Sequence, residues 1–500
     1  MPMTDKAARI IRGGLLADAS LRRARPADIL IIDDTIAEIG SPGLAAPEDA
    51  EFFDGTGFLM HPGLVNAHMH SHGGLARGQG DKWTLELLLT AAPWIGGGRA
   101  LADKKLSATI CAAEMVLKGC TTAYDLFAEV PLPTREGLDA VAEAYATVGL
   151  RAVVAPMVAD LSFYQAIPGL LDALPDDLQA AADTLRPGGG AGCLAAIEDI
   201  ARHWAWDRAS IRLAVAPTIP HHCTEEFILG CGRIARDHGL RLHTHIAESK
   251  VQALVGQQRY GRSLLQQMDC WGLVDNAFTA AHGVWLDDDD MALMADRGAT
   301  LAHNPGSNMR LGNGLFPLRR ALDRGVVVGL GTDGANCSDN QNMYEAMRYA
   351  SMASKVQSPR TEDWAGVEEI YAAATCGGSR TLGLQDVGEI RPGAKADIVF
   401  LDLGAINWIP HNATVNQLVH VEDGTSVRHV MIGGKLVVRN GRLTTVDVAH
   451  LAREVEAARD RLEQTNRPLR ALTDRLATVV GSFCPGLAGK PYHVHRYVQA

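Results

Sequence analysis

The sequence lacks a CxxC pair, a long apolar run and an excess of basic residues. Its nine cysteines, scattered from Cys111 to Cys484, are odd in number, which argues against a disulfide framework and against a cysteine-built zinc cluster. The 47 basic and 58 acidic residues give a formal charge of -11, so we expect no nucleic-acid partner. No window approaches the roughly 20 apolar residues that cross a bilayer, and the first residues lack the apolar core of a signal peptide. We therefore expect a cytoplasmic protein without a membrane partner.

Aromatic residues are also sparse, at 5%, whereas glycine is abundant, with 51 residues. Many short turns between regular elements suit this composition. The 500 residues are 47% hydrophobic and 21% charged, which provides ample material for a large core and excludes a disordered or fibrous chain.

The two ends of the chain have the same sequence pattern, in which short apolar stretches are interrupted by Gly, Asp and Pro. Such stretches predict small strands and hairpins in residues 1–60 and again in residues 385–446, where IGGK and RNGR have the signals of tight turns. Because isolated sheet edges need partners, we expect both ends to form one composite β-sandwich domain. Residues 447–500 are predicted to form a charged helix, over about 449–476, and a tail.

The middle of the chain, residues 61–384, alternates apolar β-branched runs with amphipathic helical stretches. We count eight such runs, at residues 64–70, 120–125, 150–157, 212–219, 240–248, 277–283, 299–305 and 326–334. Eight strand and helix units predict an α/β fold, a distorted (β/α)8 barrel of the TIM type. A barrel of this kind places its chemistry at the carboxyl ends of the strands.

Polar residues gather at those predicted strand ends. They are His68, His70, Asp125, His221, His243, His245, Glu248, His282, His303 and Asp333. Imidazoles gathered in one cleft with a carboxylate are what a divalent metal such as zinc requires. His68 and His70 lie two residues apart on a strand, so both rings point to the same side. An HxH pair alone is weak evidence, but joint placement at strands one, five, six and eight is hard to obtain by chance.

Five long segments carry a resemblance to a known family. They are HPGLVNAHMHSHGG, HTHIAES, AAHGVWL, LAHNPGSNMRLGNG and VGLGTDGANCSDNQNMYEAMR. The chain resembles the amidohydrolase superfamily, in the branch that holds methylthioadenosine/S-adenosylhomocysteine deaminases, guanine deaminases and triazine hydrolases. The match runs from about residue 8 to about residue 446.

The resemblance implies a metal site and a set of roles. The ligands of one divalent metal would be His68, His70, His245 and Asp333, with Zn2+ expected and Fe2+ as the alternative. Glu248 would act as general acid and base, and His282 would polarise the water, so the catalytic residues are Glu248, His282 and Asp333. Relatives with two metals need a lysine at the end of the fourth strand, where this sequence has APTIPHH, so a single metal is expected.

The substrate is less well defined by the sequence. The expected reaction is deamination of an amino-substituted N-heterocycle, a purine, pyrimidine or triazine-like ring, by a metal-bound hydroxide with release of ammonia. The nearest nucleoside deaminases carry a glutamate that holds ribose, and residues 71–100 depart from that pattern. A C–N hydrolase of an aryl urea, thiocarbamate or amide, releasing an amine or thiol, is therefore the alternative. The predicted substrate-binding residues are Trp83, His221 and His303.

One alternative function is disfavoured, and two further sequence features have simple structural interpretations. A catalytically silent barrel is disfavoured because the whole set of candidate ligands is present. Four consecutive carboxylates, Asp287 to Asp290, predict the start of a helix, where negative charge meets the positive end of the dipole. A second HxH pair, His493 and His495, has no carboxylate near it in sequence and is interpreted as a surface or subunit contact. The partners expected are a small-molecule substrate and further copies of the chain, in a homodimer or higher homo-oligomer.

Overall fold

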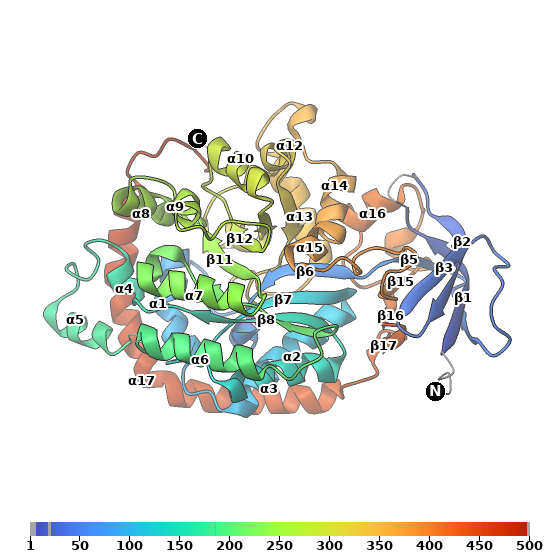
Figure 1. The fold of residues 1–500 in the computed structure, drawn as a ribbon, viewed down its shortest axis with the longest axis horizontal. Helices are drawn as coiled ribbons and strands as arrows, with labels where there is room; N and C mark the ends of the chain where they lie inside the picture. The colour runs from blue at the N-terminus through green and yellow to red at the C-terminus, as the bar shows by residue number, and fades with distance from the viewer. Residues whose placement is uncertain (1–6, 19–21, 186, 498–500) are drawn as a thin grey trace.

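The computed structural model describes residues 7–18, 22–185 and 187–497. A barrel of parallel strands occupies the middle of the molecule, with a smaller sheet at one end and a long helix along one side (Figure 1). Residues 1–6 and 498–500, the outermost parts of the predicted terminal domains, lie outside the described residues.

The barrel is built from parallel strands that follow one another in sequence. They are β6 (Leu64–Met69), β7 (Cys120–Ala128), β8 (Arg151–Val158), β9 (Ile211–Leu213), β10 (Ala216–Pro217), β11 (Leu242–Ile246), β12 (Phe278–His282), β13 (Thr300–His303) and β14 (Val327–Leu330). Most of their residues are buried, as expected of strands covered on both faces. Each of the eight predicted runs overlaps one of these strands, except that the fourth run is interrupted and overlaps both β9 and β10.

Two half-barrels join to close the ring. One sheet has the order β10-β8-β7-β6, with β9 beside β8, and the other has the order β11-β12-β13-β14. A parallel bridge between Val215 and Leu242 links β10 to β11. On the other side, the amide of Asp333 donates to the carbonyl of His68 over 2.9 Å. The approach of β14 to β6 is so close that a Cβ on Gly329 would lie 2.8 Å from the Cβ of Ala67.

Helices surround the barrel. They are α1 (Leu85–Gly96), α2 (Leu101–Leu117), α3 (Arg135–Val148), α4 (Phe163–Ala166), α5 (Asp176–Asp183), α6 (Gly190–His203), α7 (Glu225–Asp237), α8 (Lys250–Tyr260), α9 (Leu264–Cys270), α10 (Asp288–Arg297), α11 (Pro305–Arg310), α12 (Leu318–Asp323), α13 (Met343–Lys355), α14 (Val367–Ala373), α15 (Cys376–Thr381), α16 (Thr414–His420) and α17 (Val448–Ala488). The predicted fold class, a (β/α)8 barrel with a small domain made from both chain ends, is confirmed.

The small domain is a single nine-stranded sheet. Its strands are β1 (Ala8–Leu16), β2 (Arg25–Ile32), β3 (Thr35–Gly40), β4 (Glu51–Asp54), β5 (Phe58–Pro62), β15 (Ile398–Asp402), β16 (Val427–Ile432), β17 (Lys435–Arg439) and β18 (Arg442–Leu443). The two ends of the chain meet where β5 pairs with β15, and apolar side chains from both ends share one core. Since β6 begins at Leu64, directly after β5, the first barrel strand continues the course of this sheet.

Helix α17 is longer than predicted, because it continues past two prolines, Pro468 and Pro485, to Ala488. It runs along the lower edge of the barrel in Figure 1, where it contacts α1, α2 and α8. Its second half packs by Leu476 and Val480 against the segment that follows β8. The C-terminal helix thereby forms part of the wall on the side of the strand ends.

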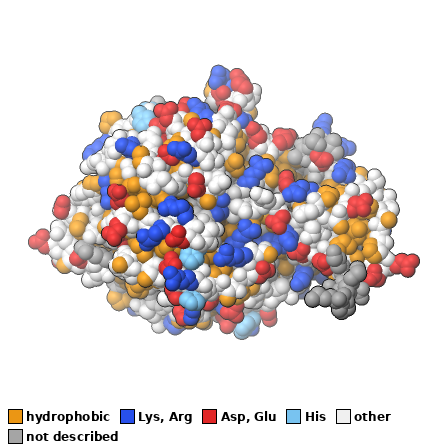
Figure 2. Space-filling model, viewed as in Figure 1, with side chains coloured by type: hydrophobic (Ala, Val, Ile, Leu, Met, Phe, Trp, Pro, Cys, Tyr) orange, Lys and Arg blue, Asp and Glu red, His pale blue; other side chains and the backbone are white. Residues whose placement is uncertain are grey.

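The surface shows no segregation of charge on the face in view. Acidic and basic side chains are interspersed there, with apolar side chains between them (Figure 2). None of the helices in the described ranges is long and apolar enough to cross a membrane.

Candidate active site

A cluster of imidazoles and one carboxylate lies at the carboxyl ends of the barrel strands. His68 comes from β6 and His70 directly follows it, His245 comes from β11, His282 from the last position of β12, and Asp333 from the segment after β14. Nε2 of His70 lies 3.1 Å from Nε2 of His245 and 3.2 Å from Oδ1 of Asp333. Nε2 of His68 and Nε2 of His282 each lie 3.7 Å from a carboxylate oxygen of Asp333. The structure thus brings together the residues that the sequence predicted for a metal site.

The hydrogen bonds of two of these rings fix which nitrogen faces the cluster. Nδ1 of His70 bonds the carbonyl of Leu126 over 2.8 Å, and Nδ1 of His245 bonds the carbonyl of Thr218 over 2.6 Å. Because a carbonyl only accepts, both Nδ1 atoms must be donors, which leaves a lone pair on each Nε2 of the neutral rings. Two lone pairs and the carboxylate of Asp333 therefore face one another at about 3 Å. Such an arrangement is repulsive unless a cation lies between the three atoms, so the donor set fits a metal ion.

His68 supports the same conclusion by its lack of partners. The residue is 0% exposed, and neither ring nitrogen has a hydrogen-bond partner among the described residues. A buried polar atom without a partner costs free energy, and native proteins rarely leave one. His243, whose ring nitrogens also lack partners among the described residues, packs its ring against Tyr124 at 4.5 Å and against His68 at 4.9 Å.

The backbone is strained at two of the strand ends. Asp333 has φ 62° and His282 has φ 69°, in the left-handed region that residues other than glycine and asparagine seldom adopt. Strain of this kind costs of order 1–3 kcal/mol and is retained mainly where a site requires it. In this barrel it turns both side chains inward at the positions where the strands end.

Glu248 lies beside the cluster and is held by an amide. Its Oε2 is 3.7 Å from Nε2 of His282, and its Oε1 accepts a hydrogen bond of 3.0 Å from Nδ2 of Asn313. His282 is held in turn by Asn308, whose Oδ1 accepts from Nδ1 over 2.8 Å. These asparagines lie within the LAHNPGSNMRLGNG motif, from which the sequence analysis selected only His303. Asparagine gave no signal of its own, because its role is to orient another side chain.

Burial and neighbouring charges shift the pKa values of the two carboxyl groups of the site, Glu248 and Asp333, in opposite directions. Burial raises the pKa of Glu248 well above its usual range, and the charges of Asp333 and Glu86 raise it further. Burial acts in the same direction on Asp333, but the neighbouring imidazoles of His70 and His282 outweigh it and lower the pKa of Asp333 below its usual range. One carboxyl group is therefore suited to give a proton and the other to remain ionised.

A cavity of about 730 Å³ opens above the cluster. Its floor includes His70, His245, Glu248 and Asp333. Its outer walls are largely apolar and include Leu85, Leu88, Leu89, Phe127, Phe163, Leu185 and Leu469. A volume of this size suits a drug-sized molecule rather than a single small ring.

Three residues predicted to bind substrate lie elsewhere. Trp83 packs among apolar side chains around α1, His221 stacks edge-on against His222, and His303 packs against Phe316 at 4.9 Å. None of the three is among the described residues that line the cavity, whereas His222 is. Their role in substrate binding stays a prediction.

The C-terminal tail, residues 490–497, crosses the mouth of the barrel. The buried guanidinium of Arg496 donates from Nε to the carbonyl of Val284 over 2.8 Å and from Nη2 to the carbonyl of Leu286 over 2.7 Å. Its own carbonyl accepts from the amide of Leu315 over 2.8 Å. The tail thereby connects the turn after β12 with the loop after α11.

The turn after β12 and the loop after α11 also hold Asn313, the hydrogen-bond partner of Glu248. Nε1 of Trp285 donates to the carbonyl of Asn313 over 2.8 Å, and the ring of Tyr497 packs against Trp285 at 5.1 Å. The tail is therefore three contacts away from the carboxyl group of Glu248, although it lies far from it in sequence.

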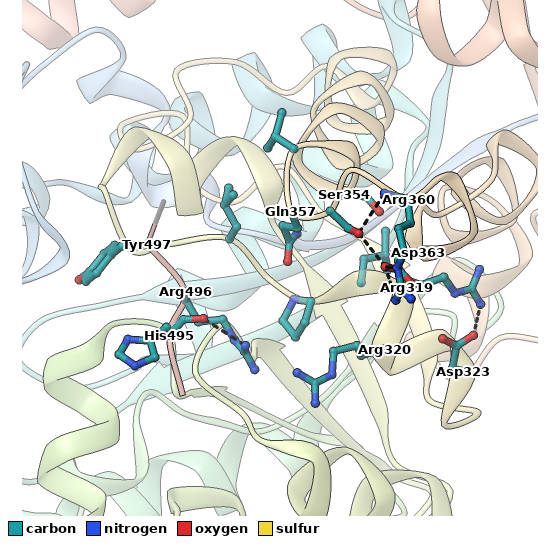
Figure 3. A pocket seen from close by; sticks show the side chains of 15 residues that line it. Arg319, Arg320, Asp323, Ser354, Gln357, Arg360, Asp363, His495, Arg496 and Tyr497 are labelled. Atoms are coloured by element: carbon teal, nitrogen blue, oxygen red, sulfur yellow. Dashed lines mark hydrogen bonds and ion pairs between the residues drawn. The ribbon is translucent and has the colours of Figure 1, made fainter. Parts of the chain in front are cut away.

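The last described residues also line a second cavity, of about 630 Å³ (Figure 3). Its arginines are largely neutralised within the wall, since Arg319 pairs with Glu369 and Asp323, and Arg360 pairs with Asp363.

The remaining motifs of the tail region are also defined. Asp287 caps α10 by accepting from the amide of Asp290, so the prediction of a helix start at this acidic run is confirmed. His493, which has no carboxylate near it in sequence, has one near it in space, because its Nε2 lies 2.8 Å from Oδ2 of Asp287. The partner is 206 residues away in sequence, which is why spacing did not reveal it.

Replacing Arg496 with Ala is expected to lower kcat roughly ten- to a hundredfold, because small displacements of a catalytic group carry losses of this size. Added guanidinium is expected to restore part of the rate, and Arg496→Lys to retain part of it. Arg320→Ala removes a half-exposed neighbour that pairs with Asp288, and it is expected to leave kcat unchanged. Steady-state kinetics at constant metal content distinguish these outcomes, and a wild-type kcat in Arg496→Ala would show that the tail does not position Glu248.

Comparison with known proteins places these observations in a wider context. A family model described as the amidohydrolase family matches residues 59–437. A 5'-deoxyadenosine deaminase from Methanothermobacter thermautotrophicus is 30% identical over 459 residues, which are 91% of this chain and 98% of that protein. A 5-methylthioadenosine/S-adenosylhomocysteine deaminase from Desulfitobacterium hafniense is 30% identical over 433 residues, which are 86% of this chain and 92% of that protein.

Solved structures share the fold over nearly the whole chain. An atrazine chlorohydrolase from Arthrobacter aurescens, crystallised with zinc, superposes with a TM-score of 0.80 at 25% identity and covers 90% of this chain and 99% of its own. An adenosine deaminase from Xanthomonas campestris with bound zinc superposes with the same TM-score at 24% identity, covering 92% and 99% of the two chains.

Proposed function

This chain belongs to the amidohydrolase family, as its sequence motifs predicted, and we propose that it deaminates an amino-substituted nitrogen heterocycle of the adenine or triazine kind. The enzyme is a hydrolase of carbon–nitrogen bonds other than peptide bonds. Water would replace the amino group on a ring carbon, and ammonia would leave.

One observation carries this proposal. Three imidazoles and a carboxylate converge within one cavity, and a carboxyl group of raised pKa lies beside them, 3.7 Å from His282. Hydrolysis of an amino-heterocycle needs these groups, because a water must lose a proton as it attacks and the departing nitrogen must gain one. The names of the similar proteins, which are deaminases of adenine nucleosides, support the choice of ring.

We assign the metal to His68, His70, His245 and Asp333, because the donor atoms of the three imidazoles lie within 4.8 Å of one another and Nε2 of His70 lies 3.2 Å from Oδ1 of Asp333. When bound, a divalent cation supplies Lewis acidity and lowers the pKa of a water toward neutrality. A single Zn2+ suits the nitrogen-rich donor set, and the zinc in two structures of the same fold supports this choice. Fe2+ is the alternative that a metal analysis would reveal.

The chain's own residues would then divide the proton transfers. The ionised carboxylate of Asp333 would accept the proton of the attacking water. Glu248 would give its proton to a ring nitrogen or to the leaving amine, with Asn313 holding its other oxygen. His282 donates from Nδ1 to Asn308 and accepts at Nε2 from Nδ2 of Asn304 over 3.3 Å, and these two asparagines would hold its ring beside the attacking water.

A substrate panel tests the proposal. Purified enzyme loaded with zinc is incubated with aminopurines and their nucleosides, aminopyrimidines, aminotriazines, aryl ureas and thiocarbamates, and products are identified by mass spectrometry. We expect ammonia together with a ring in which oxygen has replaced an amino group. Release of an amine or thiol from a urea or thiocarbamate, with no ring deaminated, would refute deamination and support C–N bond cleavage of the other kind. Chelator-treated enzyme is expected to be inactive, and added zinc to restore it.

A further inference from the structure

One cation in the wall of the cavity has no acidic partner. Arg99, in the segment between α1 and α2, lines the same cavity as the imidazole cluster. Its Nη1 lies 3.4 Å from Oγ of Ser107, which itself donates to the carbonyl of Ser71 over 2.6 Å. Because Ser71 directly follows His70, Arg99 is two hydrogen bonds away from the cluster.

The guanidinium uses only part of its hydrogen-bonding capacity. Nη2 donates to the carbonyl of Ile95 over 2.9 Å, and the contact with Ser107 is long. The Nε atom is buried and has no partner among the described residues. An arginine carries five N–H donors, so three of them remain free.

No carboxylate of the described residues forms an ion pair with Arg99. Asp103, whose charge acts on it, is already paired with Arg461 and accepts from the amide of Ala100 over 2.8 Å. Burial lowers the pKa of Arg99 to about 10, so the side chain still carries its charge at neutral pH.

Lys104, the other lysine or arginine among the described residues that line the cavity, does have an acidic partner. Lys104 forms an ion pair with Glu129, which also accepts hydrogen bonds from the amide and hydroxyl of Thr134. Arg99 is therefore the cation whose charge the surrounding protein leaves uncompensated. Arg99 is partly buried, and a charge withdrawn from water without an ion-pair partner is costly, so the side chain is suited to meet the charge of a ligand.

We propose that Arg99 binds an anionic oxygen group, such as a carboxylate, carried by the substrate at a distance from the ring that is deaminated. The inference rests on the proposed function for the reaction, but the anion site itself rests on Arg99 alone. The planar guanidinium matches the geometry of a carboxylate, and charge-assisted hydrogen bonds are the strong ones.

The size and the sequence of the region agree with this substrate class. The 730 Å³ cavity leaves most of its space for a substituent, and Leu88, Leu89 and Ile95 offer an apolar path toward the guanidinium. Arg99 also lies in residues 71–100, where the sequence departs from the nucleoside deaminases that it otherwise resembles.

Matched substrates test the proposal. A ring that the enzyme deaminates is prepared with a carboxyalkyl substituent and with the corresponding primary carboxamide. We expect kcat/KM of the wild-type enzyme to favour the carboxylate by about 10- to 100-fold, as expected for a charge-assisted hydrogen bond. Arg99→Met is expected to remove this preference while it retains turnover of the carboxamide. Arg99→Lys keeps the positive charge but loses the planar guanidinium that can form two parallel hydrogen bonds with a carboxylate, so an intermediate preference for the carboxylate substrate is expected. Lys104→Met, at the compensated cation, is expected to leave the preference unchanged.

A binding measurement separates this proposal from the proposed function. Calorimetric titration with benzoate and with benzamide is carried out on the zinc-loaded wild-type and Arg99→Met proteins. We expect benzoate to lose about 10- to 100-fold in affinity in Arg99→Met and benzamide to lose nothing. This result would uphold the anion site even if no heterocycle is deaminated. Equal benzoate affinities, or a carboxylate preference that persists in Arg99→Met, would overturn it.

Discussion

Replacing Asp333 with Asn is expected to reduce kcat/KM by at least about a thousandfold, because the change removes both a metal ligand and a proton acceptor. The amide has the same shape as the carboxylate, and asparagine tolerates the left-handed backbone of this position, where φ is 62°. The fold should therefore survive. Steady-state kinetics, zinc analysis of the purified protein and thermal unfolding together measure the effect.

A matched control exists at Asp339, which has φ 67° and pairs with Arg310 outside the cluster. Asp339→Asn makes the same chemical change in the same backbone conformation, and we expect its kcat/KM to stay close to that of the wild type. Full activity in Asp333→Asn would show that the assigned chemistry is wrong. A large loss in both variants would point to damage of the segment after β14 instead.

Replacing Glu248 with Gln is expected to lower kcat by about 10²- to 10⁴-fold, the usual contribution of a positioned general acid. Gln can still accept the hydrogen bond from Asn313, so the side chain should keep its place. Zinc content should be unchanged, because Glu248 is not one of the assigned metal ligands and its Oε2 lies 3.7 Å from Nε2 of His282. The expected signature is a loss in kcat at constant metal occupancy.

The control for Glu248→Gln is the same substitution at Glu86. This residue is also buried, and its carboxylate accepts a hydrogen bond of 2.8 Å from the hydroxyl of Ser249, the residue next to Glu248. Glu86→Gln removes one of the charges that raise the pKa of Glu248 but leaves the Glu248 carboxyl group in place, so it should lower kcat by less than about tenfold. If both variants lose activity equally, Glu248 acts by shaping the pocket and not by transferring a proton.

Much of the fold and of the candidate site could be predicted from the sequence. The barrel strands were found because buried apolar runs alternate with amphipathic helical stretches, and this alternation is local in the chain. His68, His70, His245, His282 and Asp333 were found for the same reason, since a barrel brings all of its strand ends to one face.

What could not be predicted depends on contacts between distant segments. Asn313 and Asn308 orient Glu248 and His282, but asparagine in a glycine-rich loop has no distinguishing pattern. Arg99 is notable only because no carboxylate of the described residues forms an ion pair with it, the nearby Asp103 being paired with Arg461. The pairing of His493 with Asp287 was missed because 206 residues separate them.

The position of the tail at the end of the chain determines when the active site can be completed during synthesis. His68 leaves the ribosome long before Arg496, and the 428 positions between them take roughly 20 to 90 s to translate at the usual rates of synthesis. During that interval the first imidazoles of the cluster exist without the residue that ties the loop of Asn313 to the turn after β12. The nascent chain can therefore complete its active site only near the end of its own synthesis.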